Sequence, residues 1–204
     1  MRVTLLCIFA ASASCFTLGN QASVKQRRST TLVAIGNLFE ALNPKKTYAA
    51  PCVMGDESIM SQKEHGTNHQ RVQSNLRWNC NDDLADRICS FNRHYAENAG
   101  YWDRSTTFLR EEEQTQGEIT FYDSVTSKPL FYAPRSRSWE SFVKESKIHG
   151  WPSFRDDEVD WRYVRVLPNG ECVSVDGTHL GHNLPDRSGN RYCINLVSVA
   201  GQPK

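Results

Sequence analysis

The sequence predicts a mainly β (α+β) protein in which a partly helical segment precedes a set of antiparallel strands. From Gly117 onward, short segments rich in Val, Ile, Tyr, Phe and Thr alternate with turn signals such as PNG and DRSGN. Over residues 81–113, by contrast, Leu84, Ile88 and Phe91 recur at helical spacing. The two patterns together predict a β core with helices placed before it in the chain.

Composition divides the chain into three parts. Residues 1–45 are predicted to be a targeting leader, residues 46–115 a partly helical extension, and residues 116–202 the β-rich domain. The whole chain has 24 Lys plus Arg, 23 Asp plus Glu and a formal net charge of +1. That balance argues against nucleic-acid binding through a broad basic face. No apolar run is long enough to span a bilayer, so we expect no membrane segment in the mature form. We also expect a monomer.

The predicted leader has two kinds of composition in succession. Its first fifteen residues, MRVTLLCIFAASASC, run from a basic residue through an apolar stretch to small residues, as secretory signals do. The next stretch, FTLGNQASVKQRRSTTLVAIGN, is rich in Ser, Thr and basic residues and has no acid, which is typical of transit peptides. A leader of this kind resembles the two-part plastid-targeting leaders of algae. We therefore predict a plastid destination, with secretion as the alternative.

Three segments are predicted to form the strands, over residues 117–134, 160–175 and 190–201. Within the second, Leu167-Pro168-Asn169-Gly170 separates two alternating runs. This pattern predicts a β-hairpin in which Asn169 and Gly170 supply the left-handed positions of the turn.

The last segment has a thiol on its polar face. Side chains alternate along a strand, so Arg191, Cys193 and Asn195 share one face while the residues between them, which are apolar, belong in the core. A neighbouring cation lowers the pKa of a thiol and raises its nucleophilic thiolate fraction. Cys193 is therefore a candidate nucleophile, although a cysteine buried for packing would fit the same position.

Two histidines upstream could serve that nucleophile. His179 and His182 flank Leu180-Gly181, which places two imidazoles three residues apart around a flexible glycine. Together with Cys193 and Asn195 they would supply a nucleophile, proton carriers and an orienting amide. A structural histidine pair is the alternative, and spacing does not decide between the two.

Three motifs in order resemble one known family. HGWPSF at 149–154, HLGH at 179–182 and RYCIN at 191–195 are similar to the signatures of the methionine-R-sulfoxide reductases, the MsrB or SelR family. PLF at 129–131 also matches a turn of that family. The resemblance implies two antiparallel sheets with a helical N-terminal segment. It also implies reduction of the R epimer of methionine sulfoxide in oxidised proteins, without a cofactor and with thioredoxin or a similar external thiol reductant.

The resemblance also implies roles for single residues. Cys193 would be the nucleophile that attacks the sulfoxide sulfur and becomes a sulfenic acid. His179, His182 and Asn195 would position and protonate the sulfoxide oxygen. The remaining motif residues would bind the substrate: Trp151, Phe154 and Arg191. For the two aromatic residues, plain core packing is the alternative.

The chain departs from the family at the positions of a structural zinc. Two CxxC pairs hold zinc in many members, and the corresponding positions here are Asp123, Thr126, Val173 and Asp176. This set is not a zinc site. The chain therefore resembles the zinc-free type, and we expect no metal.

A second departure concerns the recycling of the enzyme. His149 stands where many members have a resolving cysteine directly before GWPSF. The sulfenic acid on Cys193 would then be reduced by an external thiol, or by Cys80, Cys89 or Cys172.

Two other classes of protein remain as alternatives. One is a module that keeps the fold and binds methionine or methionine sulfoxide in a partner protein without turnover. The other is a Cys-His hydrolase, which would need an oxyanion hole and a group that orients the histidine.

Overall fold

The computed structural model describes residues 47–114 and 117–204, and Lys45–Lys204 form one compact unit. The predicted leader over residues 1–45, with its plastid or secretory destination, lies outside the described residues. No helix in the described ranges has the length and apolar character that a bilayer crossing requires.

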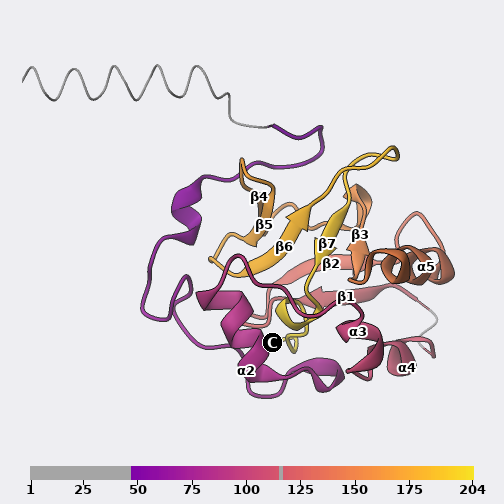
Figure 1. Ribbon diagram of the computed structural model, residues 1–204, viewed down its shortest axis with the longest axis horizontal. Helices are drawn as coiled ribbons and strands as arrows, with labels where there is room; N and C mark the ends of the chain where they lie inside the picture. Colours follow the sequence, from indigo (N-terminus) through magenta and orange to yellow (C-terminus); the bar gives the residue numbers. More distant parts are fainter. Residues whose placement is uncertain (1–46, 115–116) are drawn as a thin grey trace, which may run out of the picture. The chain divides into compact units, whose positions relative to one another are not determined.

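Antiparallel strands form two sheets in the described part of the chain, as predicted (Figure 1). The larger sheet has the order β3-β7-β6-β5-β4. Its strands are β3 (Ser153–Phe154), β4 (Val164–Val166), β5 (Glu171–Ser174), β6 (His179–Asn183) and β7 (Tyr192–Ile194). The smaller sheet pairs β1 (Ile119–Tyr122) with β2 (Pro129–Ala133).

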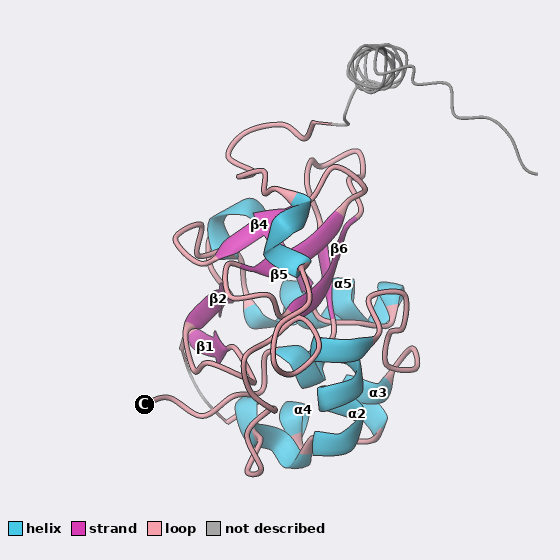
Figure 2. Cartoon of the chain, turned by 90° about the vertical axis from the view of Figure 1, so that its left-hand side faces the viewer, coloured by secondary structure: helices cyan, strands magenta, loops and turns pink. Residues whose placement is uncertain are grey.

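The helices are short, and most of them precede the sheets in the chain. The α-helices are α2 (Asp82–Asp86), α3 (Tyr101–Arg104), α4 (Phe108–Glu112) and α5 (Trp139–His149). The 3-10 helices are η1 (Glu57–Met60), η2 (Arg77–Asn79), η4 (Asp156–Glu158) and η5 (Leu196–Ser198), and η3 (Arg87–Phe91) is a π-helix. Figure 2 shows α2, α3 and α4 gathered on one side of the strands. The predicted helical N-terminal segment is therefore confirmed as a set of short helices.

The helix predicted from the spacing of Leu84, Ile88 and Phe91 is confirmed, since these residues lie in α2 and η3, but the three do not share one buried face. Ile88 is fully buried, whereas Phe91 is 57% exposed. The reason is that α2 continues into the π-helix η3, where the amide of Asn92 donates to the carbonyl of Arg87 at 2.9 Å. The wider turn of a π-helix moves Phe91 off the buried face.

The hairpin predicted at Leu167–Gly170 joins β4 to β5. The amide of Leu167 donates to the carbonyl of Glu171, and that of Gly170 to the carbonyl of Leu167, each at 2.8 Å. Gly170 has φ +95°, which glycine adopts without a steric penalty. The expectation of a left-handed Asn169 was wrong. Its side chain instead accepts a hydrogen bond from the amide of Glu171 at 2.9 Å.

Helix α5 was not identified in the sequence, and it fixes the position of β3. The Phe142 side chain of α5 is fully buried and packs on Trp139 and Phe154, with ring centroids 5.6 and 5.5 Å away. Phe154 in turn stacks on Phe131 of β2 at 4.4 Å. This aromatic core links the helix to both sheets, and it holds the short strand β3 beside β7.

Candidate functional site

Cys193 lies on β7, an interior strand of the larger sheet. On β7 it pairs with His182 of β6 on one side and with Ser153 of β3 on the other. Gly181 allows β6 to approach this closely, because a Cβ there would lie 2.1 Å from the carbonyl oxygen of Cys193. The register therefore sets an imidazole-bearing residue directly across from the thiol-bearing one.

The predicted alternation along β7 is confirmed, but the polar face of the strand is more buried than its polarity suggests. Tyr192 and Ile194 are fully buried in the core, as expected, and Cys193 is partly exposed. Arg191 and Asn195, on the polar face with Cys193, are also buried, at 7% and 2% exposure. The thiol thus lies among covered polar groups.

A pocket of about 250 Å³ opens beside Cys193. Its lining includes five of the residues predicted from the sequence: Trp151, His179, His182, Cys193 and Asn195. The lining also includes residues that were not predicted, which are His94, Tyr95, Ala96, Gly181 and Leu184. Pockets for drug-sized ligands have volumes of roughly 300–1,000 Å³, so this one suits a single side chain better than a bulky cofactor.

His179 is held by a carboxylate that sequence reasoning missed. Its Nδ1 lies 2.8 Å from the Oε1 of Glu171, and Arg93 donates to the same carboxylate at 3.0 Å. Burial raises the pKa of Glu171, but the hydrogen bonds and charges of His179 and Arg93 outweigh it and lower the pKa to about 2. Glu171 is therefore an ionised partner that fixes the orientation of His179.

Burial also controls the titration of the thiol and of the second imidazole. It raises the pKa of Cys193, against the hydrogen bond and positive charge of Arg191. Burial, together with the neighbouring His179, lowers the pKa of His182, whose ring centroid lies 5.7 Å from that of His179. Arg191 Nε lies 3.5 Å from Asp186, and within the described residues neither Nε nor Nη1 has a hydrogen-bond partner. The resting pocket thus favours a thiol beside a neutral imidazole.

Several predicted residues lie away from the pocket. Phe154 is fully buried in the aromatic core and does not line the pocket, so core packing accounts for it. The candidate resolving thiols Cys80, Cys89 and Cys172 are also buried, burial raises the pKa of each, and none lines the pocket. Cys52, which was not considered, is partly exposed.

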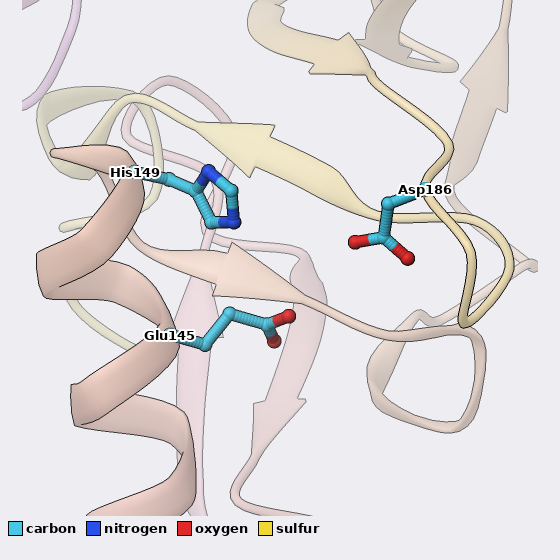
Figure 3. Close-up of side chains that lie close together, drawn as sticks. All are labelled: Glu145, His149 and Asp186. Atoms are coloured by element: carbon cyan, nitrogen blue, oxygen red, sulfur yellow. The ribbon is translucent and has the colours of Figure 1, made fainter.

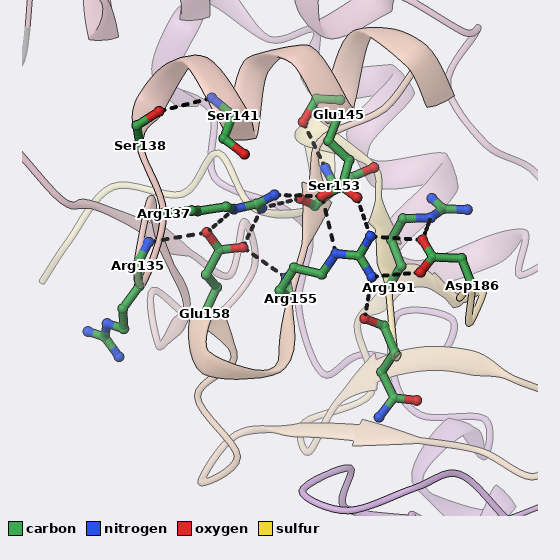
Figure 4. A network of polar contacts seen from close by, with 12 residues as sticks. Arg135, Arg137, Ser138, Ser141, Glu145, Ser153, Arg155, Glu158, Asp186 and Arg191 are labelled. Carbon is green, nitrogen blue, oxygen red and sulfur yellow. Dashed lines mark hydrogen bonds and ion pairs between the residues drawn. The ribbon is translucent and has the colours of Figure 1, made fainter. Parts of the chain in front are cut away.

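His149 belongs to a group that superficially suggests a metal site. Figure 3 shows it close to Glu145 and Asp186, with one potential ligand atom of each residue within 4.8 Å of the others. Figure 4 shows Arg155 between the two carboxylates, and its guanidinium donates to both. Because a cation would have to displace this arginine, we treat the group as a salt-bridge network and assign it no metal.

The residues at the family's zinc positions do not fit zinc either. Asp123 is fully buried and accepts hydrogen bonds from the amide of Val125 at 2.8 Å and from the hydroxyl of Thr178. The ammonium of Lys128 lies 2.9 Å from Asp176. A hydrogen bond and an ion pair therefore join the β1–β2 turn to the loop after β5.

The fold defines a class before any particular relative is considered. Two antiparallel sheets with few helices are consistent with a β-rich fold of the MsrB type, and a partly exposed thiol and two imidazoles lie at a small pocket of this fold. No family model matches the chain. It is, however, 34% identical over 86 residues to the peptide methionine sulfoxide reductase MsrB of Escherichia coli strain K12 / DH10B and of strain O157:H7.

These matches cover 37% of this chain and 56% of each relative. The chain thus spans about half the length of the curated relatives it matches. Over this stretch the chain is similar to curated proteins named MsrB, which supports the resemblance seen in the motifs.

Proposed function

We propose that this protein reduces the R epimer of methionine sulfoxide in oxidised proteins back to methionine and so repairs oxidative damage. One observation carries the proposal. Cys193 pairs directly with His182, and both line a small pocket together with Trp151, His179 and Asn195. The relatives named MsrB support the same chemistry.

The proposed reaction has two steps, reduction of the sulfoxide by Cys193 and regeneration of the Cys193 thiol. The sulfur of Cys193 attacks the sulfoxide sulfur, and the oxygen passes to the cysteine, so the products are methionine and a Cys193 sulfenic acid. Two thiols of an external reductant then convert the sulfenic acid to the free thiol, with release of water and formation of the reductant's disulfide. The substrate gains two electrons, and the reductant supplies them.

The pocket residues move the proton and hold the substrate. Burial lowers the pKa of His182 and so favours its neutral form, which can take the thiol proton and pass it to the sulfoxide oxygen. The side-chain amide of Asn195 donates to the backbone carbonyl of Leu180 at 3.0 Å and keeps a second N–H for the sulfoxide oxygen. The Trp151 ring packs against the methyl thioether, a contact that sulfur–aromatic attraction favours.

The reductant in this proposal is an external thioredoxin-like dithiol. Burial of Cys80, Cys89 and Cys172 supports an external thiol over an internal one. The composition of the leader supports a plastid destination, with secretion as the alternative. We propose no metal or other cofactor for the reaction.

The test uses the full chain with dabsyl-methionine-R-sulfoxide and, separately, the S epimer, with dithiothreitol and then thioredoxin as reductant. We expect loss of the R epimer only. Cys193→Ser should abolish turnover, whereas Cys52→Ser, the matched variant at another partly exposed thiol, should retain it. Folded wild-type protein that turns over neither epimer would reject the reductase and favour a module that binds methionine or its sulfoxide.

A second candidate function, a Cys-His hydrolase, gains one specific observation. Glu171 supplies the orienting partner for a histidine that the sequence did not reveal. That partner holds His179, however, whereas the residue paired with Cys193 is His182. Release of p-nitrophenol from a p-nitrophenyl ester without any reductant, lost in Cys193→Ser, would favour the hydrolase.

A further inference from the structure

One wall of the pocket comes from the segment between η3 and α3. His94, Tyr95 and Ala96 line the pocket, although they precede the β-rich domain, which was predicted to begin at residue 116. Tyr95 is 40% exposed at the edge of the pocket. A segment of this kind, outside any helix or strand, needs an anchor if it is to present a fixed wall.

The next residue, Glu97, contacts two of the pocket residues through its backbone. Its carbonyl accepts a hydrogen bond from Nε1 of Trp151 at 3.0 Å. Its amide donates to Oδ1 of Asn195 at 3.1 Å. These two bonds orient the indole ring and the side-chain amide that the proposed reaction uses.

The side chain of Glu97 provides the anchor. Its carboxylate accepts hydrogen bonds from the amides of Leu196 at 2.9 Å and Val197 at 3.1 Å, the two residues that follow Asn195. Glu97 is 2% exposed, and burial raises the pKa of its carboxyl group to about 8. A buried carboxyl group bound in this way fixes the loop against the backbone of η5 (Leu196–Ser198).

We propose that Glu97 is a positioning residue, which fastens the 94–97 segment to η5 and thereby holds Asn195 and Trp151 in place beside Cys193. This inference rests on the proposed reductase function. The backbone bonds to Trp151 and Asn195 can form with any residue except proline at position 97. Their geometry depends on the side chain, because the carboxylate sets where that backbone lies relative to Asn195.

The test compares Glu97→Ala and Glu97→Gln with Asp123→Asn in the full chain. Asp123 is a matched control because it is also a buried carboxylate that accepts backbone N–H groups, but it does not line the pocket. Glu97→Ala should lower kcat/KM for the R epimer by about tenfold to a hundredfold. We expect a lower kcat because Asn195 is displaced, and a higher KM because Trp151 is displaced. Glu97→Gln, which keeps one acceptor oxygen, should lose about fivefold.

Hydrogen exchange provides a readout that does not depend on turnover. Glu97→Ala should speed exchange of the amides of residues 94–97, whereas Asp123→Asn should speed exchange near residues 125–126 and leave kcat/KM within about twofold. An active wild type with unchanged kcat/KM in Glu97→Ala would overturn this inference and leave the reductase intact. An inactive wild type would reject the reductase, and unchanged exchange at 94–97 would then reject the anchor as well.

Discussion

Two buried glutamates on different elements support the same pocket with opposite electrostatics. Glu171 on β5 and Glu97 in the segment before α3 are each 2% exposed. Glu171 contacts the charged Arg93 and the imidazole of His179, and its pKa falls to about 2. Glu97 receives hydrogen bonds from two backbone amides, and burial raises its pKa to about 8. Equal burial is thus accompanied by opposite pKa shifts, because the charges of the partners decide the outcome.

For the two glutamates, the largest expected effect is that of removing the Glu171 side chain. Glu171→Ala frees His179 from its orienting partner and leaves Arg93 with one carboxylate fewer, so we expect about a hundredfold loss of kcat/KM and a loss of stability on the order of 3 kcal/mol. Glu171→Gln should lose less, since its amide oxygen can still accept a hydrogen bond. The dabsyl-sulfoxide assay and urea unfolding measure the two effects. Full activity in Glu171→Ala would mean that His179 needs no orientation.

The dependence of stability on pH should separate the two glutamates. Because the folded pKa of Glu171 is depressed, its contribution is present above pH 4.5 and is lost as the pH falls towards 2. Because the folded pKa of Glu97 is raised, its contribution is present below pH 4.5 and is lost as the pH rises through 8. The contribution is on the order of 3 kcal/mol for Glu171 and on the order of 5 kcal/mol for Glu97.

Urea unfolding of the wild type, Glu171→Gln and Glu97→Gln between pH 3 and pH 9 measures these contributions. Glu171→Gln should flatten the acid side of the stability curve, and Glu97→Gln the neutral side. If both variants kept the wild-type curve, the contrast between the two carboxyl groups would be refuted.

The smallest expected effect is that of changing the buried cysteines, whose surroundings differ from those of Cys193 as the surroundings of the two glutamates differ from each other. Cys193 lies beside the Arg191 cation at an open pocket, whereas Cys80, Cys89 and Cys172 are buried. Changing each of these three to Ala should leave turnover within about twofold with either reductant and lower stability by about 1 kcal/mol. A variant that works with dithiothreitol but fails with thioredoxin would identify that cysteine as a resolving thiol.

The sequence by itself determined the features that depend on local patterns. Alternation along residues 190–201 predicted which face of β7 enters the core and which carries Cys193. The turn signals predicted the β4–β5 hairpin, and three ordered motifs brought five pocket residues together. These features follow from the two-residue period of a strand and from short turns, which a few neighbouring residues specify.

Only the tertiary structure decided what surrounds and orients the site. Arg93 reaches Glu171 across 78 positions, and Glu97 reaches Asn195 across 98. The tertiary structure also placed Phe154 in the aromatic core rather than in the pocket. No periodicity or short motif encodes such pairs, because burial, charge and hydrogen bonding act between atoms that become neighbours only when distant segments pack together.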